Sequence, residues 1–294
     1  MNYFGIIKKA YHLTLKNRFL WIFGILAGGY GGFRGYNFGT SDFLQNSNGN
    51  LNNFNFDSFW SQYGGLVASI GLIMAILFFV LFILNIISQG ALIGSVAKLS
   101  SGEKVDFNEG FHTGWKKFWR VLGTMVIYFL IILAVILLWI TPTVLFAAVL
   151  SVPFAIFWGI LFFLAVVAFF FLVAVISPYS FRAVVLKNKS ITESISDSVH
   201  LCRENLATVI VIYLLLFAIG MAFGIAIFIA VVLIGALLFG IGFVAFLASG
   251  VLGIFYAVVV GAFFLAAIVT LAGAYGAFSS AVITLTYQEL LKKS

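Results

Sequence analysis

The sequence contains few charged residues and a single cysteine, and each shortage excludes a class of protein. Charged residues make up 9% of the 294 residues, hydrophobic residues make up 63%, and the mean hydropathy is +1.18. This composition excludes a soluble globular domain and is typical of an integral membrane protein. The one cysteine, Cys202, excludes an internal disulfide and cannot build a metal site alone.

Signatures of catalysis and of energised transport are also missing. No ionisable residue falls inside a predicted span, although proton-coupled transporters, ion pumps and voltage sensors usually need one there. No serine has a matching histidine and carboxylate set, and no glycine-rich phosphate loop follows a strand. His12, His112 and His200 lack acidic or cysteine partners at metal-ligand spacing. We therefore expect a protein that is not an enzyme and that holds no metal or cofactor.

Three segments share one pattern, in which a cap is followed by an amphipathic helix and then by an apolar span. Apolar residues recur at i, i+4, i+8 and i+11 in two segments, and the first segment differs only in its last residue. The three stripes are Tyr3, Ile7, Tyr11 and Thr14; Phe107, Phe111, Trp115 and Phe118; and Ile191, Ile195, Val199 and Cys202. Ala10, Gly114 and Ser198 match as small residues one place before the third stripe position.

The helix start signals agree across the three segments. Asp106 with Glu109 and Ser190 with Glu193 fit capping boxes, and Asn2 can act as an N-cap. The sequence therefore predicts a threefold internal repeat, with units at roughly 2–96, 105–182 and 189–290. A chance match between short amphipathic segments is the alternative.

Apolar runs predict about six transmembrane helices in one membrane domain that covers residues 1–294. They are a short segment from Phe19 to about Phe33, then 66–87, 121–140 and 144–176, and two spans within the charge-free stretch 206–288. Turns are predicted at 141–143, at 177–179 and among Gly240, Gly242, Ser249 and Gly250, and Pro153 marks a kink or a span start. Residues 34–63 are rich in Asn, Gly and Ser and predict a polar low-complexity loop.

Charge placement predicts the orientation in the membrane. With six spans, every Lys and Arg except Arg34 lies on one side, and Arg34 lies beside Asp42 and Asp57 on the other. The positive-inside rule then places both termini in the cytoplasm. Three spans within 206–288 would instead place Lys292 and Lys293 outside, so two are preferred.

Two sets of residues are candidate sites. The basic residues at the bases of the three units are candidate headgroup-binding residues, because cations near an anionic leaflet attract lipid headgroups. They are Lys8, Lys9, Lys16, Arg18, Lys116, Lys117, Arg120 and Arg203. Asn85 and Gln89, at i and i+4 near the cytoplasmic end of the span predicted at 66–87, are candidate intramembrane polar residues that bond helices together or line a substrate path.

The opening FGIIKKAYHLTLKNRFLWIFGILAGG, the Gly/Asn-rich loop after it and the later helix-plus-span units carry a family resemblance. Together they resemble a loose group of uncharacterised bacterial six-span proteins that are similar to the membrane domain of glycerophosphodiester phosphodiesterases. The resemblance implies a multi-pass protein of a bacterial inner (plasma) membrane. It does not imply the phosphodiesterase reaction, because that group's soluble catalytic barrel has no counterpart here.

The leading hypothesis is an all-α polytopic bundle with three amphipathic interfacial helices and a lipid-interacting, accessory or scaffolding role. Its expected partners are membrane lipids with anionic headgroups, not nucleic acid, and a second copy or another membrane protein is a further candidate. The alternative is a transporter or channel for a small apolar or lipid-like solute, with Asn85 and Gln89 along its path.

Overall fold

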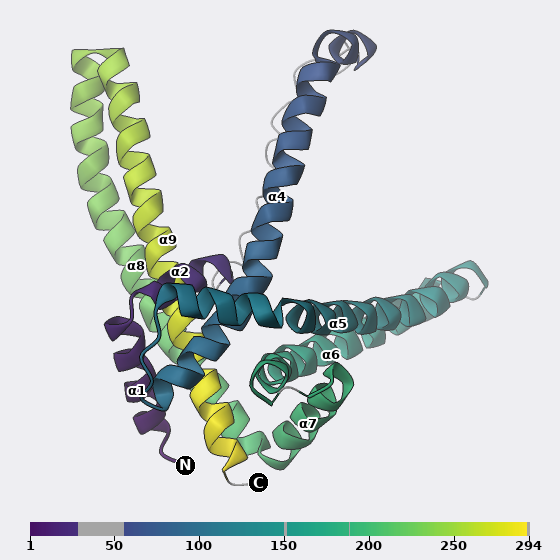
Figure 1. Cartoon of the computed structure of the whole chain (residues 1–294). Helices are drawn as coiled ribbons and strands as arrows, with labels where there is room; N and C mark the ends of the chain where they lie inside the picture. The colour runs from purple at the N-terminus through teal and green to yellow at the C-terminus, as the bar shows by residue number, and fades with distance from the viewer. Residues whose placement is uncertain (29–55, 150–151, 188, 293–294) are drawn as a thin grey trace.

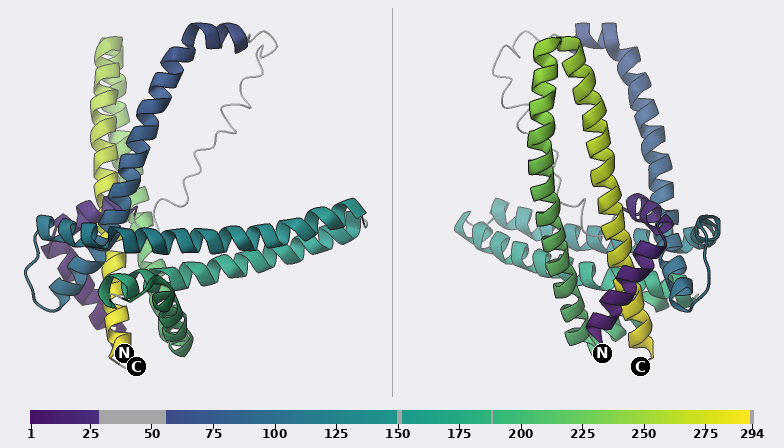
Figure 2. Two further views of the ribbon diagram at one scale, coloured as in Figure 1. Left: turned by 45° about the vertical axis from the view of Figure 1, so that its right-hand side comes forward. Right: turned by 90° about the vertical axis from the view of Figure 1, so that its left-hand side faces the viewer.

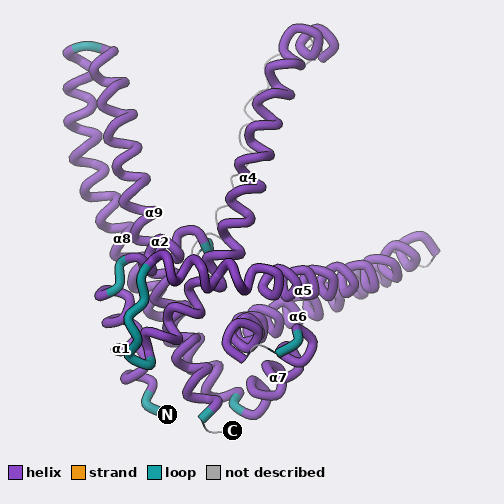
Figure 3. Tube along the Cα trace, viewed as in Figure 1, coloured by secondary structure: helices purple, strands orange, loops and turns teal. Residues whose placement is uncertain are grey.

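The computed structural model describes residues 1–28, 56–149, 152–187 and 189–292, and this part of the chain is almost entirely helical (Figure 3). Its helices are α1 (Tyr3–Lys16), α2 (Phe19–Leu26), α4 (Phe56–Ser100), α5 (Phe107–Val149), α6 (Val152–Lys187), α7 (Ile191–Glu204), α8 (Leu206–Ala248) and α9 (Gly250–Leu291). The predicted all-α fold class is confirmed. The helices α4, α5, α6, α8 and α9 each contain an apolar run long enough to cross a membrane.

The helices converge at one end of the molecule, which we call the hub (Figure 1). The hub comprises α1, α2, α7 and the adjoining ends of the long helices, at residues 85–100, 107–128, 175–187, 206–219 and 273–291. Three arms extend from it: the rest of α4, the rest of the α5–α6 hairpin and the rest of the α8–α9 hairpin. The first and third arms run in the same general direction, whereas the α5–α6 arm lies crosswise to them (Figures 1 and 2).

The arms are apolar on every side. Among their described side chains only Gly64 and Gly253 are buried, while residues such as Phe239 and Phe263 are 76% and 80% exposed. The one charged residue in the arm helices is Asp57, in the first turn of α4 at the end away from the hub. A helix that is hydrophobic all round belongs in a protein core or in a membrane. The arms are not covered by protein, so they fit within lipid.

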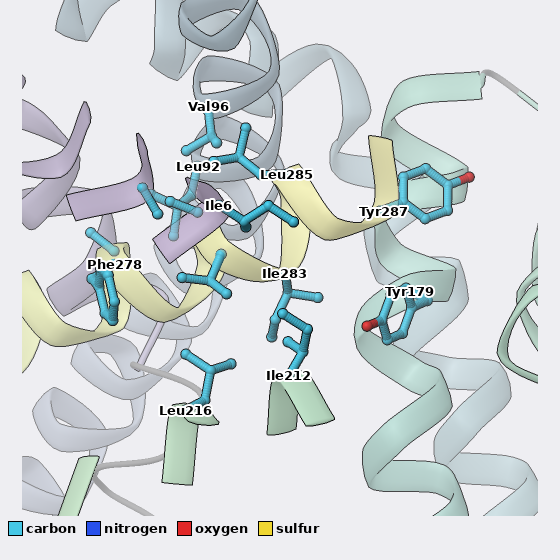
Figure 4. Packing of buried hydrophobic residues seen from close by; sticks show 14 of the residues in the cluster. Ile6, Leu92, Val96, Tyr179, Ile212, Leu216, Phe278, Ile283, Leu285 and Tyr287 are labelled. Carbon is cyan, nitrogen blue, oxygen red and sulfur yellow. The ribbon is translucent and has the colours of Figure 1, made fainter. Parts of the chain in front are cut away.

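The hub contains the hydrophobic core. Side chains from α1, α4, α6, α8 and α9 interlock there, among them Ile6, Leu92, Val96, Tyr179, Ile212, Leu216, Ile283, Leu285 and Tyr287 (Figure 4). A second cluster joins α4, α5 and α6 through Ile86, Val121 and Phe181. Burying one large apolar side chain contributes about 1.5–3 kcal/mol. These contacts hold the helices in register at the hub.

Three helix contacts in the hub follow one scheme. α1 packs on α9, α5 packs on α4, and α7 packs on α6. The small residues Ala10, Gly114 and Ser198 are all buried on the packed helices. A Cβ on Gly114 would overlap the carbonyl oxygen of Ile87, so only glycine permits this approach of α5 to α4. The small residues therefore lie on the packed face, and the predicted apolar stripe beside them stays partly exposed, as at Tyr11, Trp115 and Val199, which are 59%, 59% and 43% exposed.

Helix caps explain why the amphipathic helix ends before the next helix in two of the three segments and continues into it in the third. Asn2 caps α1 by accepting from the Gly5 amide at 2.9 Å, and Ser190 caps α7 by accepting from the Glu193 amide at 3.4 Å, as predicted. At the other end of α1, Asn17 donates from its side chain to the Leu13 carbonyl oxygen at 2.9 Å.

Asn205 repeats this bond at the end of α7, to the Leu201 carbonyl oxygen at 3.2 Å. In the pattern that aligns the three segments, Val121 takes the place of these asparagines and has no polar group to cap a helix end. The predicted boundary between a surface helix and a span at residue 121 is therefore wrong, because α5 runs through it unbroken.

Two predicted turns are also wrong. The helix α5 continues through Pro142 to Val149, and α6 continues through Pro178 to Lys187. Proline removes one backbone hydrogen bond from a helix but does not end it where the flanking residues still favour helix. The span predicted at 66–87 likewise continues as helix beyond its predicted end, since α4 runs to Ser100.

Other boundaries agree with the sequence. The chain turns at Ser249, within the predicted region, and α6 begins at Val152, next to Pro153. Within the predicted loop 34–63, residues 56–63 instead form the first turns of α4, and residues 34–55, with Arg34, lie outside the described residues. The first predicted span contains only the eight residues of α2 in the described part, about 12 Å at 1.5 Å per residue, against a hydrocarbon core of about 30 Å.

Candidate functional site

Arg182 lies at the polar centre of the hub and is 3% exposed. Its Nε donates to Thr284 Oγ1 at 3.1 Å, and its Nη2 donates to the carbonyl oxygen and hydroxyl of Ser280, both at 3.1 Å. Its Nη1 donates to the carbonyl oxygen of Pro178 at 2.6 Å. Because Ser280 and Thr284 belong to α9, the guanidinium fastens α6 to α9.

The position of Arg182 corrects the expectation that a turn at 177–179 separates it from the apolar helix before it. It lies inside the apolar run Ile156–Lys187, with α6 continuous around it. A buried cation is costly unless hydrogen-bond acceptors surround it, and carbonyl and hydroxyl oxygens of α6 and α9 supply them here. The sequence contained a signal for a buried arginine, since Arg182 has apolar neighbours on both sides in YSFRAVVL. The turn predicted at 177–179 hid this signal, because it separated Arg182 from the span.

Asn85 and Gln89 form a second part of this polar centre, on α4. Asn85 Nδ2 donates to the Leu26 carbonyl oxygen of α2 at 2.8 Å, and Gln89 Nε2 donates to Asn85 Oδ1 at 2.9 Å. Asn85 therefore bonds α4 to the end of α2. Gln89 is 6% exposed, and its Oε1 has no hydrogen-bond partner among the described residues.

A small cavity of about 20 Å³ lies between these groups. Its lining includes Gln89 from α4, Arg182 from α6 and Ser280 from α9, together with apolar residues such as Phe181. The sequence predicted neither the cavity nor its arginine. The structure brings Gln89 to the same cavity as Arg182 and leaves Asn85 outside its lining.

A larger cavity lies in the α8–α9 arm. It has a volume of about 260 Å³ and is lined only by apolar residues. They are Phe223, Ala226, Ile227, Ala230, Val231, Ile234, Phe264, Ala267, Ile268 and Leu271. A groove with such walls has no group to orient a polar ligand.

The candidate headgroup-binding cations are distributed over four helices of the hub. They belong to α1, to the N-terminal end of α2, to α5 and to α7, and all are exposed except the half-buried Lys117. Lys9 donates to the Ser100 carbonyl oxygen at 3.1 Å. Lys8, Lys116 and Arg203 form no ion pair with the described residues, so their charges face the surroundings.

A row of aromatic residues, two exposed and two half-buried, accompanies the cations of α5. Phe107, Phe111, Trp115 and Phe118 follow one another with ring centroids 6.2–6.5 Å apart. Phe23 of α2 stacks on Phe107 at 5.0 Å. Aromatic rings beside basic residues are typical of the membrane–water interface.

The helix α7 is held to α6 by an ion-pair cluster around Asp197. Asp197 Oδ2 accepts from Lys189 at 2.6 Å and lies 3.6 Å from Lys187 Nζ. The hydrogen bond from Lys189 lowers the pKa of the Asp197 carboxyl below its ordinary value. On the same helix, burial raises the pKa of the Cys202 thiol to about 12, so the thiol is protonated and unreactive at neutral pH.

The described residues contain no group of three or more His, Cys, Asp or Glu side chains that could hold a metal ion. On the exposed face of α7, His200 Nδ1 instead lies 3.3 Å from Glu204 Oε2. Comparisons with family models, with curated proteins and with solved structures give no match for this chain. The resemblance to the phosphodiesterase membrane-domain group therefore stays a prediction.

Proposed function

We propose that this protein is a non-enzymatic membrane protein that binds anionic lipid headgroups at one leaflet and acts there as an accessory or scaffold. One observation carries the proposal. Every charged side chain that the structure describes belongs to the hub or to the short segments next to its helices, whereas the described side chains of the arms are uncharged and mostly exposed. Hydrocarbon suits the arms, and a hub with cations directed outward suits the headgroup layer.

The packing scheme of the hub supports a threefold repeat. In the sequence, α5 follows α4 and α7 follows α6, and each packs on the long helix that precedes it. The helix α1 occupies the corresponding place on α9. A repeat arranged in a ring accounts for all three contacts. In this scheme α1, α7 and the first half of α5 are the interfacial amphipathic helices.

We further propose that the hub faces the cytoplasm of a bacterial cell, in agreement with the positive-inside rule. The helix α2 lies in the hub, whereas α4 begins at the end of its arm away from the hub. The two hairpins each return to the hub. The number of crossings is then even, and both termini lie on the hub side, where Figures 1 and 2 show them close together.

The cavities favour this function over transport of a solute. A transporter needs a path between the units with polar groups along it, and the polar cavity of the hub has room for about one water molecule. The apolar groove of about 260 Å³ between α8 and α9 suits part of an acyl chain. It supports contact with lipid and offers nothing to select a polar solute.

Lipid enrichment around the intact protein tests the proposal. The full chain is placed in nanodiscs of mixed phosphatidylcholine and phosphatidylglycerol, and the lipids that stay bound on release are identified by native mass spectrometry. We expect phosphatidylglycerol to be enriched over its share in the disc. A triple variant with one exposed cation removed from each helix, Lys8→Gln, Lys116→Gln and Arg203→Gln, should lose most of the enrichment, since each charge contributes about 1 kcal/mol.

The matched control removes three basic residues outside these helices, by Lys104→Gln, Lys292→Gln and Lys293→Gln. It should keep the enrichment. Equal retention of both lipids by the natural chain would refute the proposal. Equal losses in the two triple variants would show that net charge alone, without the three helices, attracts the lipid.

A further inference from the structure

The amide groups of Asn85 and Gln89 can be oriented in only one way. The Leu26 carbonyl oxygen accepts a hydrogen bond from the Asn85 side chain, so the Asn85 nitrogen must face it. The Asn85 oxygen then faces Gln89 and must receive the Gln89 nitrogen. Gln89 Oε1 then faces away from Asn85 and is left as a free hydrogen-bond acceptor among the described residues.

This acceptor is buried beside the small cavity. Gln89 is 6% exposed, lines the cavity, and its Oε1 has no partner among the described residues. Leaving a buried carbonyl oxygen without a hydrogen-bond donor carries a free-energy penalty. A donor within the cavity would remove that penalty.

Size and polarity point to one donor. The cavity volume of about 20 Å³ exceeds the 10–15 Å³ that one water molecule needs, and it is too small for an organic ligand. Arg182 and Ser280 also line it, so a water there would have three polar neighbours. An anion would be attracted by Arg182 but repelled by the Gln89 oxygen.

We infer that the cavity binds a single structural water molecule that donates to Gln89 Oε1 and lies against Arg182 and Ser280. This water joins two hydrogen-bonded groups that are otherwise separate. One runs from Leu26 through Asn85 to Gln89, and the other runs from Arg182 to α9. With the water in place, one polar network connects α2, α4, α6 and α9, so it includes a helix from each proposed repeat unit.

Radiolytic hydroxyl labelling of the full chain in nanodiscs tests the inference, because a bound water produces radicals inside the protein. Phe181 lines the cavity and is 4% exposed, whereas Phe23 is also buried in the hub, at 0% exposed, and does not line it. We expect Phe181 to be labelled several-fold faster than Phe23 if a water is bound next to it. Equal rates would overturn the inference.

One variant distinguishes the water from a general opening of the hub. Gln89→Leu removes the acceptor and should lower Phe181 labelling to the rate of Phe23, whereas an opening of the hub would raise the labelling of both residues. Undiminished labelling in Gln89→Leu would contradict the proposed bond. A bromide ion located in the cavity by anomalous scattering would overturn the assignment in favour of an anion, and this readout needs no variant to fold.

Discussion

Arg182 is held by acceptors on its own helix and on α9, and no other side-chain type could reach all of them. Lysine has a single ammonium group and would lose the Nε and paired Nη geometry. Hydrogen bonds to charged groups contribute about 1.5–3 kcal/mol each, so Arg182→Lys should destabilise the protein by about that amount and Arg182→Ala by about 3–5 kcal/mol.

Unfolding by SDS in mixed micelles measures both losses. The exposed Arg203 provides the comparison, since Arg203→Ala should change stability by less than about 0.5 kcal/mol. If Arg182→Ala were as stable as Arg203→Ala, the hydrogen bonds around Arg182 would not fasten α6 to α9.

Two glycines, Gly24 of α2 and Gly273 of α9, allow these helices to approach closely in the hub. A Cβ on Gly24 would overlap the carbonyl oxygen of Gly273 and lie 2.9 Å from the Ala277 nitrogen. Gly24→Ala should therefore separate α2 from α9 and destabilise the protein by about 1–3 kcal/mol.

The matched control is Gly261→Ala, in the arm part of α9, where a Cβ meets no atom within 4 Å. Replacing glycine by alanine inside an unobstructed helix is favourable by about 0.5–1 kcal/mol. Thermal melting in detergent should thus move in opposite directions for the two variants, and a shared direction would contradict the close packing of α2 on α9.

At the scale of elements, α7 is held by the contact of Asp197 with Lys187 and Lys189. Because Lys189 lowers the pKa of Asp197, the contact stabilises α7 at neutral pH and is lost as the pH falls through that lowered pKa, below about pH 4. Hydrogen exchange of α7, corrected for the intrinsic rate, should be constant from pH 7 to 5 and rise below pH 4.

Asp197→Asn should loosen α7 already at pH 7. Cys202 is the one cysteine of the chain and is 3% exposed, so its labelling by a thiol reagent reports on α7 alone. We expect faster labelling in Asp197→Asn, and an unchanged rate would show that apolar contacts suffice to hold α7.

Helix type could be predicted from the sequence because unbroken apolar runs leave few alternatives. The caps Asn2 and Ser190 were also predictable, because a capping side chain bonds to a backbone amide only three residues away. Helix continuity through Pro142 and Pro178 was not, since a proline stops a helix or only bends it according to what packs around it.

The candidate site was predicted in part. Asn85 and Gln89 stand out as amides in an apolar run, and their bond to each other follows from their spacing. The role of Arg182 depends on Ser280 and Thr284, about 100 residues away in the sequence. A contact between such distant residues has no local signal.

At the scale of the whole molecule, the crosswise α5–α6 arm conflicts with a flat bilayer that contains the other two arms. Apolar surface left in water costs about 25 cal/mol per Å². In a bilayer we therefore expect this arm to turn toward the others, with Pro178 near its base as the natural bend because proline lacks one helical hydrogen bond.

Spin labels at Leu137→Cys and Phe228→Cys, with Cys202→Ala, would report the change as a distance between the two hairpin arms. The distance should be shorter in nanodiscs than in detergent. A pair at Leu77→Cys and Phe228→Cys joins the two arms that already run in one direction and should change little. If the first distance is the same in both environments, the arm is rigid and its crosswise position is native to the membrane.

The contact between α1 and α9 has a consequence for biosynthesis. The helix α1 is synthesised before α9 and must wait for it before the two can dock. The α1 face that packs on α9 therefore stays uncovered while the helices between them are made. A circular permutant that joins the two neighbouring ends and opens the chain between α6 and α7 would shorten this delay and should mature faster in the cell.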